Sequence, residues 1–174
     1  MRTIFGAALL VGLAVCAPAM GQMQEAAPTC PAPVAPFGAL APWISPVAMQ
    51  AVGYQQRVSR ARLVTGQAAR LSLLQTPDVH YPLRPEKPGG SVSFGGLAQI
   101  FVRESGTYRV ALSSAAWIDV VTGKGGLKPV TFGRGPDCTG ILKMVDFVLT
   151  PGRYTLQIAA NGTPEVTVLV ARLP

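Results

Sequence analysis

The residues of this chain that could carry chemistry are few and widely spaced. Its single histidine, His80, lies two residues after Asp78 in the proline-bracketed segment TPDVHYPLRP. An Asp-x-His pair can hold a proton or a metal ion, but a mononuclear metal site needs further histidine or cysteine ligands, and a hydrolase needs a nucleophile beside an oriented base. The sequence supplies neither, so we interpret His80 as a loop residue and predict no metal site and no catalytic residue.

Two carboxylates fall within apolar stretches. Asp119 in AWIDVV shares a strand face with Trp117, and Asp146 shares one with Met144 and Val148. A carboxyl group on a partly apolar face can have the raised pKa that a general acid needs. A structural carboxylate paired with arginine or with backbone N–H groups occupies the same kind of position, and we favour that interpretation for both.

The most distinctive irregular segment is TGKGGLKPVTFGRGPDCTG, residues 122–140. Its glycines and basic residues are typical of phosphate-binding loops, but it has no Gly-Lys-Ser/Thr ending and no strand-to-helix context. Loops on a rigid framework are common binding sites. We therefore predict a binding loop that includes Lys124, Lys128, Arg134 and Asp137.

The first 21 residues have the features of a secretory signal peptide. Arg2 is followed by an uncharged apolar run, and AMG at 19–21 has the small-x-small form of a cleavage site. We expect cleavage near Gly21 and a periplasmic or secreted protein, with no transmembrane segment elsewhere. Lipidation at Cys16 is the alternative, although the lipoprotein signal needs a small residue directly before that cysteine.

Removal of the signal leaves two of the three cysteines, Cys30 and Cys138. An even count in an oxidising compartment favours a disulfide between them, with two free thiols or a metal pair as the alternatives. In the chain-entropy model a loop of this length is worth about 4–5 kcal/mol as an upper figure. The bridge would anchor a Pro/Ala-rich arm, residues 22–46, to a single domain, residues 47–174.

The net charge of +7 invites a nucleic-acid interpretation. The Lys and Arg residues are scattered singly, however, and no basic run alternates with aromatic residues. We expect a mildly basic surface and no nucleic-acid partner.

The chain after the arm is typical of an all-β protein, because short runs of branched and aromatic residues are broken by Gly, Pro, Asn and Asp. We predict an antiparallel β-sandwich of Greek-key or jelly-roll type. Only residues 47–64 could hold a helix, and Gly53 argues against one. The arm should lie on the domain through Phe37, Leu40, Trp43 and Ile44. The expected strands are 47–52, 60–65, 69–75, 97–104, 107–113, 116–121, 128–132, 141–149, 153–159 and 165–172.

Strand alternation is clearest after each of two similar segments, FVRESGTYRVAL (101–112) and FVLTPGRYTLQI (147–158). Each predicts a strand, a tight turn and a second strand. The second has the Leu-x-Pro-Gly-x-Tyr spacing of the tyrosine corner of Greek-key sandwiches, and we predict that Pro151, Gly152 and Tyr154 form one. The first is a weaker version without the proline. Duplication and convergent turn chemistry would each explain the likeness.

The alternation also predicts which side chains face the core. Tyr, Val and Leu at alternate positions from 108 to 112 should point inward, as should Tyr154, Leu156 and Ile158 in the second segment. Arg153, Thr155 and Gln157 should lie on the opposite, outer face.

The runs GTYRVALSSAAWIDVV and GRGPDCTGILKMVDFVLTPGRYTLQI resemble a family of small exported bacterial proteins of similar length that often carry the label homogentisate 1,2-dioxygenase. The likeness covers roughly residues 28–172, and GPDC (135–138) and KMVDF (143–147) are its most specific parts. That label implies non-haem iron held by two histidines and a carboxylate. One histidine cannot complete the set within one chain, so we expect no cofactor, and iron only if the label is right.

The leading functional hypothesis is an exported, non-enzymatic β-sandwich that binds a partner or a cell-envelope component through its glycine-rich loops. The alternative is an enzyme, either an oxygenase as the family label suggests or a hydrolase that uses Asp119 or Asp146. A third interpretation is an envelope protein whose basic surface contacts anionic lipid or polysaccharide.

Overall fold

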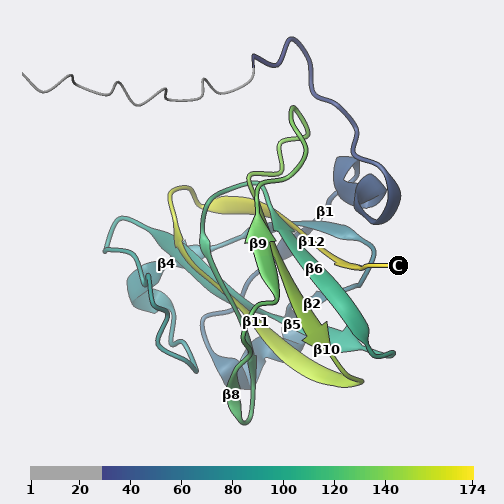
Figure 1. Cartoon of the computed structure of the whole chain (residues 1–174). Coiled ribbons are helices and arrows are strands. Elements are labelled where there is room, and N and C mark those ends of the chain that lie inside the picture. Colours follow the sequence, from purple (N-terminus) through teal and green to yellow (C-terminus); the bar gives the residue numbers. More distant parts are fainter. Residues whose placement is uncertain (1–28) are drawn as a thin grey trace, which may run out of the picture.

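Two β-sheets packed face to face form the body of the protein (Figure 1). The computed structural model describes residues 29–174, so the predicted signal peptide, its cleavage site and Cys16 lie outside the described residues. The first sheet has the order β1-β3-β12-β6-β10-β9. The second has the order β2-β5-β11-β7-β8, and β4 also pairs with β5. The all-β sandwich predicted from the sequence is confirmed.

The elements follow the predicted strands closely, apart from three short 3-10 helices. The helices are η1 (Gly38–Ile44), η2 (Gln55–Arg60) and η3 (Thr76–Asp78). The strands are β1 (Val47–Gln50), β2 (Arg62–Leu63), β3 (Ala68–Ser72), β4 (Leu74–Gln75), β5 (Phe94–Val102), β6 (Gly106–Leu112), β7 (Trp117–Thr122), β8 (Gly125–Gly126), β9 (Thr131–Gly133), β10 (Lys143–Leu149), β11 (Gly152–Asn161) and β12 (Glu165–Arg172).

Parallel pairing occurs in each sheet, beside a framework that is otherwise antiparallel. β1 runs parallel to β3, and β2 runs parallel to β5. The helix η2 lies between β1 and β2 along the chain and replaces the start of the strand expected at residues 60–65. No helix among residues 29–174 is long and apolar enough to cross a membrane.

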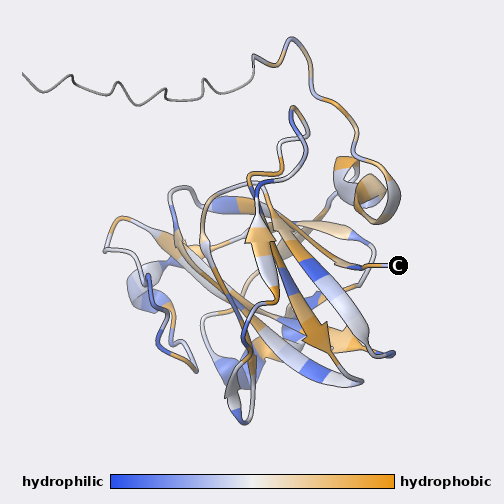
Figure 2. Ribbon diagram, in the orientation of Figure 1, coloured by the Kyte–Doolittle hydropathy of each residue, from blue (hydrophilic) through white to orange (hydrophobic). Residues whose placement is uncertain are grey.

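The core lies between the two sheets and is built from the alternate positions that the sequence predicted. Tyr108, Val110 and Leu112 of β6 meet Leu156 and Ile158 of β11 across it, and all five are buried. Figure 2 shows the hydrophobic residues of these strands in orange. Burial of this alternating set against the facing sheet is what fixes which side of each strand points inward.

The outer faces of the sheets are also covered in part. On the first sheet, Leu40 and Trp43 of η1 are buried against β12 and β6, and the Trp43 indole N–H donates to the carbonyl of Thr139 at 2.9 Å. Phe37 and Ile44, which we expected to lie on the domain, are 87% and 64% exposed. A 3-10 turn can direct only one side of its surface at the sheet, so half of the predicted contacts are made.

Tyrosine corners fix two of the points where the chain passes from one sheet to the other. The Tyr154 hydroxyl donates to the Thr150 carbonyl at 2.8 Å and accepts from the Thr150 N–H at 3.1 Å, between β10 and β11. The Tyr108 hydroxyl donates to the Glu104 carbonyl at 2.8 Å, between β5 and β6. The predicted corner at Tyr154 is confirmed, and the segment without proline forms one as well.

The two similar segments nevertheless differ before their turns. Phe147 is buried and Val148 exposed, whereas Phe101 is 45% exposed and Val102 is buried. Since side chains alternate along a strand, this reversal means that the last core residue before the turn is offset by one position between the two segments. The aligned Phe-Val pairs therefore have opposite roles, and Phe101 becomes available on the outer face of the second sheet.

Substitution of the two corner tyrosines tests this account. Tyr154→Phe should lower the free energy of unfolding by about 2 kcal/mol, because it leaves both the Thr150 carbonyl and the Thr150 N–H without their partner. Tyr108→Phe removes one bond and should cost about 1 kcal/mol. Urea unfolding of the two variants measures the difference, and equal costs would contradict the assignment of two bonds to the second corner.

Candidate functional site

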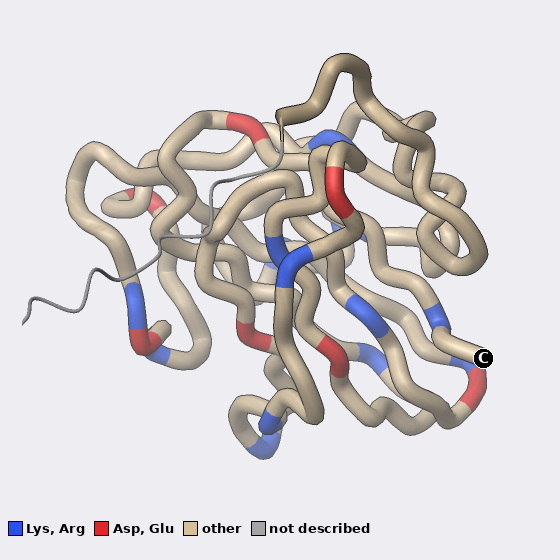
Figure 3. Tube along the Cα trace, turned by 45° about the horizontal axis from the view of Figure 1, so that its top comes forward, with Lys and Arg blue, Asp and Glu red and all other residues tan. Residues whose placement is uncertain are grey.

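Four arginines that are far apart in the sequence lie at one end of the sandwich. In the ladder between β5 and β11, Arg153 is directly opposite Phe101. In the pair β2–β5, Arg62 is opposite Gln99, two residues from Phe101. The other two, Arg103 and Arg172, follow β5 and end β12. Figure 3 shows several basic segments in blue around the C-terminus, which Arg172 precedes by two residues.

These arginines line a cleft, which we call the arginine cleft. Its main part has a volume of about 550 Å³, and a side hollow of about 130 Å³ shares Arg62 and Phe101 with it. Phe101 and Val64 contribute exposed apolar surface to its wall. The residues that line the main part are Arg62, Leu63, Val64, Thr65, Phe101, Arg103, Glu104, Tyr108 and Arg172, and Arg153 lines the side hollow.

The charge in the arginine cleft is predominantly positive. Among the described residues, Glu104 is the only carboxylate that lines it, and its side chain lies 3.4 Å from the Arg172 guanidinium. Both side chains are largely exposed, so this pair is weak. Within residues 29–174 the side chains of Arg62, Arg103 and Arg153 form no ion pair. Three guanidinium groups are therefore available to an anion.

A polar atom in the cleft wall has no partner in the fold. The Thr65 hydroxyl oxygen is buried, and it makes no hydrogen bond with any described residue. A buried hydroxyl without a partner costs stability. Its position in the wall of a cleft lined by arginines is consistent with a binding role.

Asp119 lies on the same outer face of the second sheet, in a network of hydrogen bonds. Its two oxygens accept from the Trp117 indole N–H at 3.0 Å and from the Gln157 amide at 3.1 Å. Burial raises the pKa of Asp119, and these two hydrogen bonds oppose the rise. Because both oxygens are occupied, the geometry favours the structural interpretation of Asp119 over a catalytic one.

The segment between η3 and β5, which we call the strap, closes over this network. Gln157, predicted to be on the outer face, is fully buried beneath it and exchanges two hydrogen bonds of 3.0 Å with the backbone of Leu83. The Tyr81 hydroxyl donates to the Ile158 carbonyl at 3.1 Å. Tyr81 passes so close to Gly95 that a side chain there would collide with its hydroxyl.

Two lysines lie over the Trp117 ring. The Lys143 ammonium is 5.3 Å from the ring centroid and donates to the Ala116 carbonyl at 2.8 Å, and the Lys87 ammonium of the strap is 5.8 Å from the centroid. Burial, and then the neighbouring Lys87, lower the pKa of Lys143. This cluster holds the strap against β7 by cation–π attraction.

Asp146 also has a structural partner. Its two oxygens accept hydrogen bonds of 2.8 Å from the Arg109 guanidinium on the neighbouring strand β6. The fork raises the pKa of Arg109, chiefly through the hydrogen bond. Such a two-point pair is a strong structural contact, and it leaves Asp146 no free oxygen for acid–base work.

His80 and the carboxylates do not form the iron site that the family label implies. The His80 ring stacks on Tyr54 with centroids 4.3 Å apart. Among residues 29–174, no three His, Cys, Asp or Glu side chains gather in a way that could hold a metal ion. The residues present therefore do not fit a site with two histidines and a carboxylate.

The predicted binding loop is divided by the fold. Lys124 lies in the turn between β7 and β8, and Lys128 follows β8, whereas Arg134 and Asp137 belong to the loop between β9 and β10 (Figure 1). Of these four residues, only Arg134 and Asp137 line a common hollow, one of about 370 Å³. The residues that we expected to act together are thus separated into two groups.

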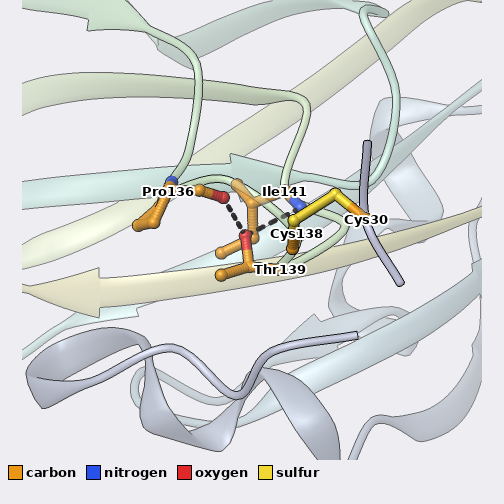
Figure 4. Close-up of a disulfide and its surroundings, with 5 residues drawn as sticks. All are labelled: Cys30, Pro136, Cys138, Thr139 and Ile141. Carbon is orange, nitrogen blue, oxygen red and sulfur yellow. Dashed lines mark hydrogen bonds between the residues drawn. A yellow bond between two sulfur atoms is a disulfide. The ribbon is translucent and has the colours of Figure 1, made fainter. Parts of the chain in front are cut away.

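The disulfide supports the second of these groups. Cys30 is bonded to Cys138, with Cα atoms 5.3 Å apart, which confirms the predicted pairing. Figure 4 shows the bridge beside Thr139, whose hydroxyl donates to the Pro136 carbonyl at 2.7 Å and accepts from the Ile141 N–H at 3.3 Å. The N–H of Val34 donates to the Cys138 carbonyl at 2.8 Å. The arm is therefore held to this loop by a disulfide and by a hydrogen bond.

The arginine cleft was missed by the sequence reasoning, which treated the basic residues as scattered. The one available signal was Arg153, an arginine at an outward position beside the tyrosine corner. Its neighbours come from β2, β5 and β12, and only the strand register brings them together.

The chain matches no known protein-family model, and no curated protein is significantly similar to it.

The strap gives a test that depends on pH. Burial, and then the charge of Asp119, raise the pKa of Tyr81 from 10.0 to about 12. The stability that the protonated phenol contributes is therefore complete below pH 10 and is lost as the pH rises toward 12. At neutral pH, Tyr81→Phe should lower the free energy of unfolding by about 1 kcal/mol through the lost hydrogen bond.

The difference between wild-type protein and Tyr81→Phe should shrink as the pH is raised through that window. Urea unfolding at a series of pH values measures it. Comparison of the two proteins removes the contribution of the other titrating groups, which both share. A difference that stays constant up to the highest pH would contradict the half-buried position of the Tyr81 hydroxyl between the strap and the strands β5 and β11.

Proposed function

We propose that the protein is an exported, non-enzymatic binding module that holds an anionic component of the cell envelope in the arginine cleft. The observation that carries the proposal is the set of four guanidinium groups around Phe101, faced by a single carboxylate. The arginine side chain is suited to this role because its planar fork binds carboxylate or phosphate at two points and stays charged at every relevant pH.

Export is supported by two features. The first 21 residues have the charge, apolar run and small-residue ending of a secretory signal. The Cys30–Cys138 bridge is typical of proteins that fold in an oxidising compartment. Both are consistent with a periplasmic or secreted location, in which an anionic component of the cell envelope is within reach of the protein.

The glycine-rich loop is a weaker candidate for the binding surface. Its basic residues occupy two separate places, and the hollow beside the disulfide has one arginine and one carboxylate, so their charges offset each other. The dioxygenase alternative has less support still, because the single histidine is stacked on Tyr54 and residues 29–174 hold no cluster of three side chains that could bind a metal ion.

Two triple variants with the same loss of charge test the proposal. The cleft variant is Arg62→Gln, Arg103→Gln and Arg153→Gln. The control is Lys124→Gln, Lys128→Gln and Arg134→Gln, all exposed residues outside the arginine cleft. Binding is measured to polygalacturonate and to vesicles that contain phosphatidylglycerol, at low and at moderate salt.

The cleft variant should bind the preferred anion about 30-fold more weakly than wild type, which corresponds to about 2 kcal/mol. The control should keep its affinity within about threefold, because only long-range attraction is lost and salt screens it. Equal losses in the two variants would mean that net charge alone attracts the anion. That result would overturn the proposal, as would a wild-type protein that binds neither probe.

A further inference from the structure

A third hollow adjoins the arginine cleft, and we call the three adjacent hollows together the groove. This hollow of about 220 Å³ is lined by residues of η2, β5, β7 and β11, and it shares Gln99 and Arg153 with the side hollow of the arginine cleft. The side hollow in turn shares Arg62 and Phe101 with the main part. The groove therefore crosses the outer face of the second sheet, from β2 over β5 and β11 to β7.

The two halves of the groove differ in chemistry. The half near β2 holds Arg62, Arg103 and Arg172. The half near β7 has no charged residue beyond the shared Arg153, and its polar groups are amides and hydroxyls. Besides Arg153, the polar residues of that half are Gln55, Gln99, Thr122, Tyr154 and Thr155.

Gln99 lies at the junction of the two halves and has an unused side chain. It is only 9% exposed, and its backbone N–H donates to the Ala61 carbonyl, but its side-chain amide makes no hydrogen bond with any described residue. Gln157 on the neighbouring strand is fully buried and has its amide occupied by Leu83 and Asp119. Thr65 Oγ1 is the only buried side-chain N or O atom without a partner among residues 29–174, so the amide atoms of Gln99 still reach solvent in the groove and are open to a ligand.

We infer that the groove binds a linear acidic oligosaccharide, with its acid groups at the arginines and a neutral hydroxyl-bearing unit at Gln99. The inference rests on the proposed function and adds the class of ligand and its direction along the groove. A glutamine amide offers both a donor and an acceptor, which matches the hydroxyl groups of a sugar. Phe101 supplies apolar surface between the two halves.

A peptide fits the groove less well. The central strands β5 and β11 that form its floor are each paired on both sides, so they have no free backbone edge to which an extended peptide could add. The groove also lacks a deep apolar pocket for a peptide side chain, because its exposed apolar wall consists of Phe101 and Val64.

The experiment measures affinity for galacturonate, for oligogalacturonates of increasing length and for poly-glutamate, with wild type and with Gln99→Leu. In wild type, affinity should rise at least about tenfold from the monomer to the longer oligomers, because only these reach both halves. Gln99→Leu should bind the long oligomers at least about fivefold more weakly while it unfolds at an equal or higher urea concentration.

Gln157→Leu is the matched control, since it is the same change at a glutamine whose amide is fully bonded. It should unfold at a lower urea concentration than wild type, whereas its affinity, measured under conditions where it is folded, should stay within about twofold. Comparison of the two variants distinguishes a glutamine whose side chain binds the ligand from one whose side chain stabilises the fold.

Three results would overturn the inference. They are a monomer that binds as tightly as the long oligomers, a Gln99→Leu variant with unchanged affinity, and a preference for poly-glutamate over oligogalacturonate. In each case the loss of binding in the variant that lacks Arg62, Arg103 and Arg153 would still support the proposed function. If the triple arginine variant bound as tightly as wild type, both the inference and the proposed function would be wrong.

Discussion

The pairing of β5 with β11 is the constraint on which the other features depend. Its register sets Phe101 opposite Arg153 and Gln99 opposite Thr155 at one end, and brings Gly96 opposite Ile158 at the other. The first end becomes the floor of the groove, and the second end seats the strap through Tyr81. A slip of one residue would turn the core side chains of the shifted strand outward, Ile100 in β5 or Leu156 in β11, so the buried core enforces the register of the polar surface. The two tyrosine corners hold the same register from outside the ladder, since each fixes one strand of the pair at its point of entry or exit.

The sequence contained enough information to predict the core residues and the disulfide. Period-two alternation in β6, β11 and β12 and the spacing before Tyr154 depend on neighbours in the chain, and the two cysteines left only one possible pair. The 3-10 helices and the parallel edge strands were out of reach, because short irregular segments take their conformation from the surface on which they pack. The same limit hid the burial of Gln157, since its position is polar in the sequence and only the strap above it excludes water.

The lysine and arginine side chains have chemically distinct roles in the structure. The lysines at 87 and 143 serve the fold, where their ammonium groups lie over Trp117, and Arg109 is held in a two-point pair with Asp146. Within the part of the chain that the structure describes, the side chains of the groove arginines make only exposed contacts, those of Arg172 with Glu104 and with the Ser105 carbonyl. Arginine suits a wall whose neighbours include Phe101 and Val64, because its guanidinium is more weakly hydrated than an ammonium group and tolerates contact with apolar surface. Net charge alone could not reveal this division.

The disulfide determines how the molecule responds to mechanical load. A tension applied to the chain on the N-terminal side of Cys30 passes through the sulfur–sulfur bond directly to Cys138, just before β10. The polypeptide between the two cysteines, which includes η1 and every strand from β1 to β9, lies outside the path of the force. The pull is therefore borne first by β10 to β12, and the earlier strands receive it only through their ladders with these three, such as β3 with β12 and β5 with β11.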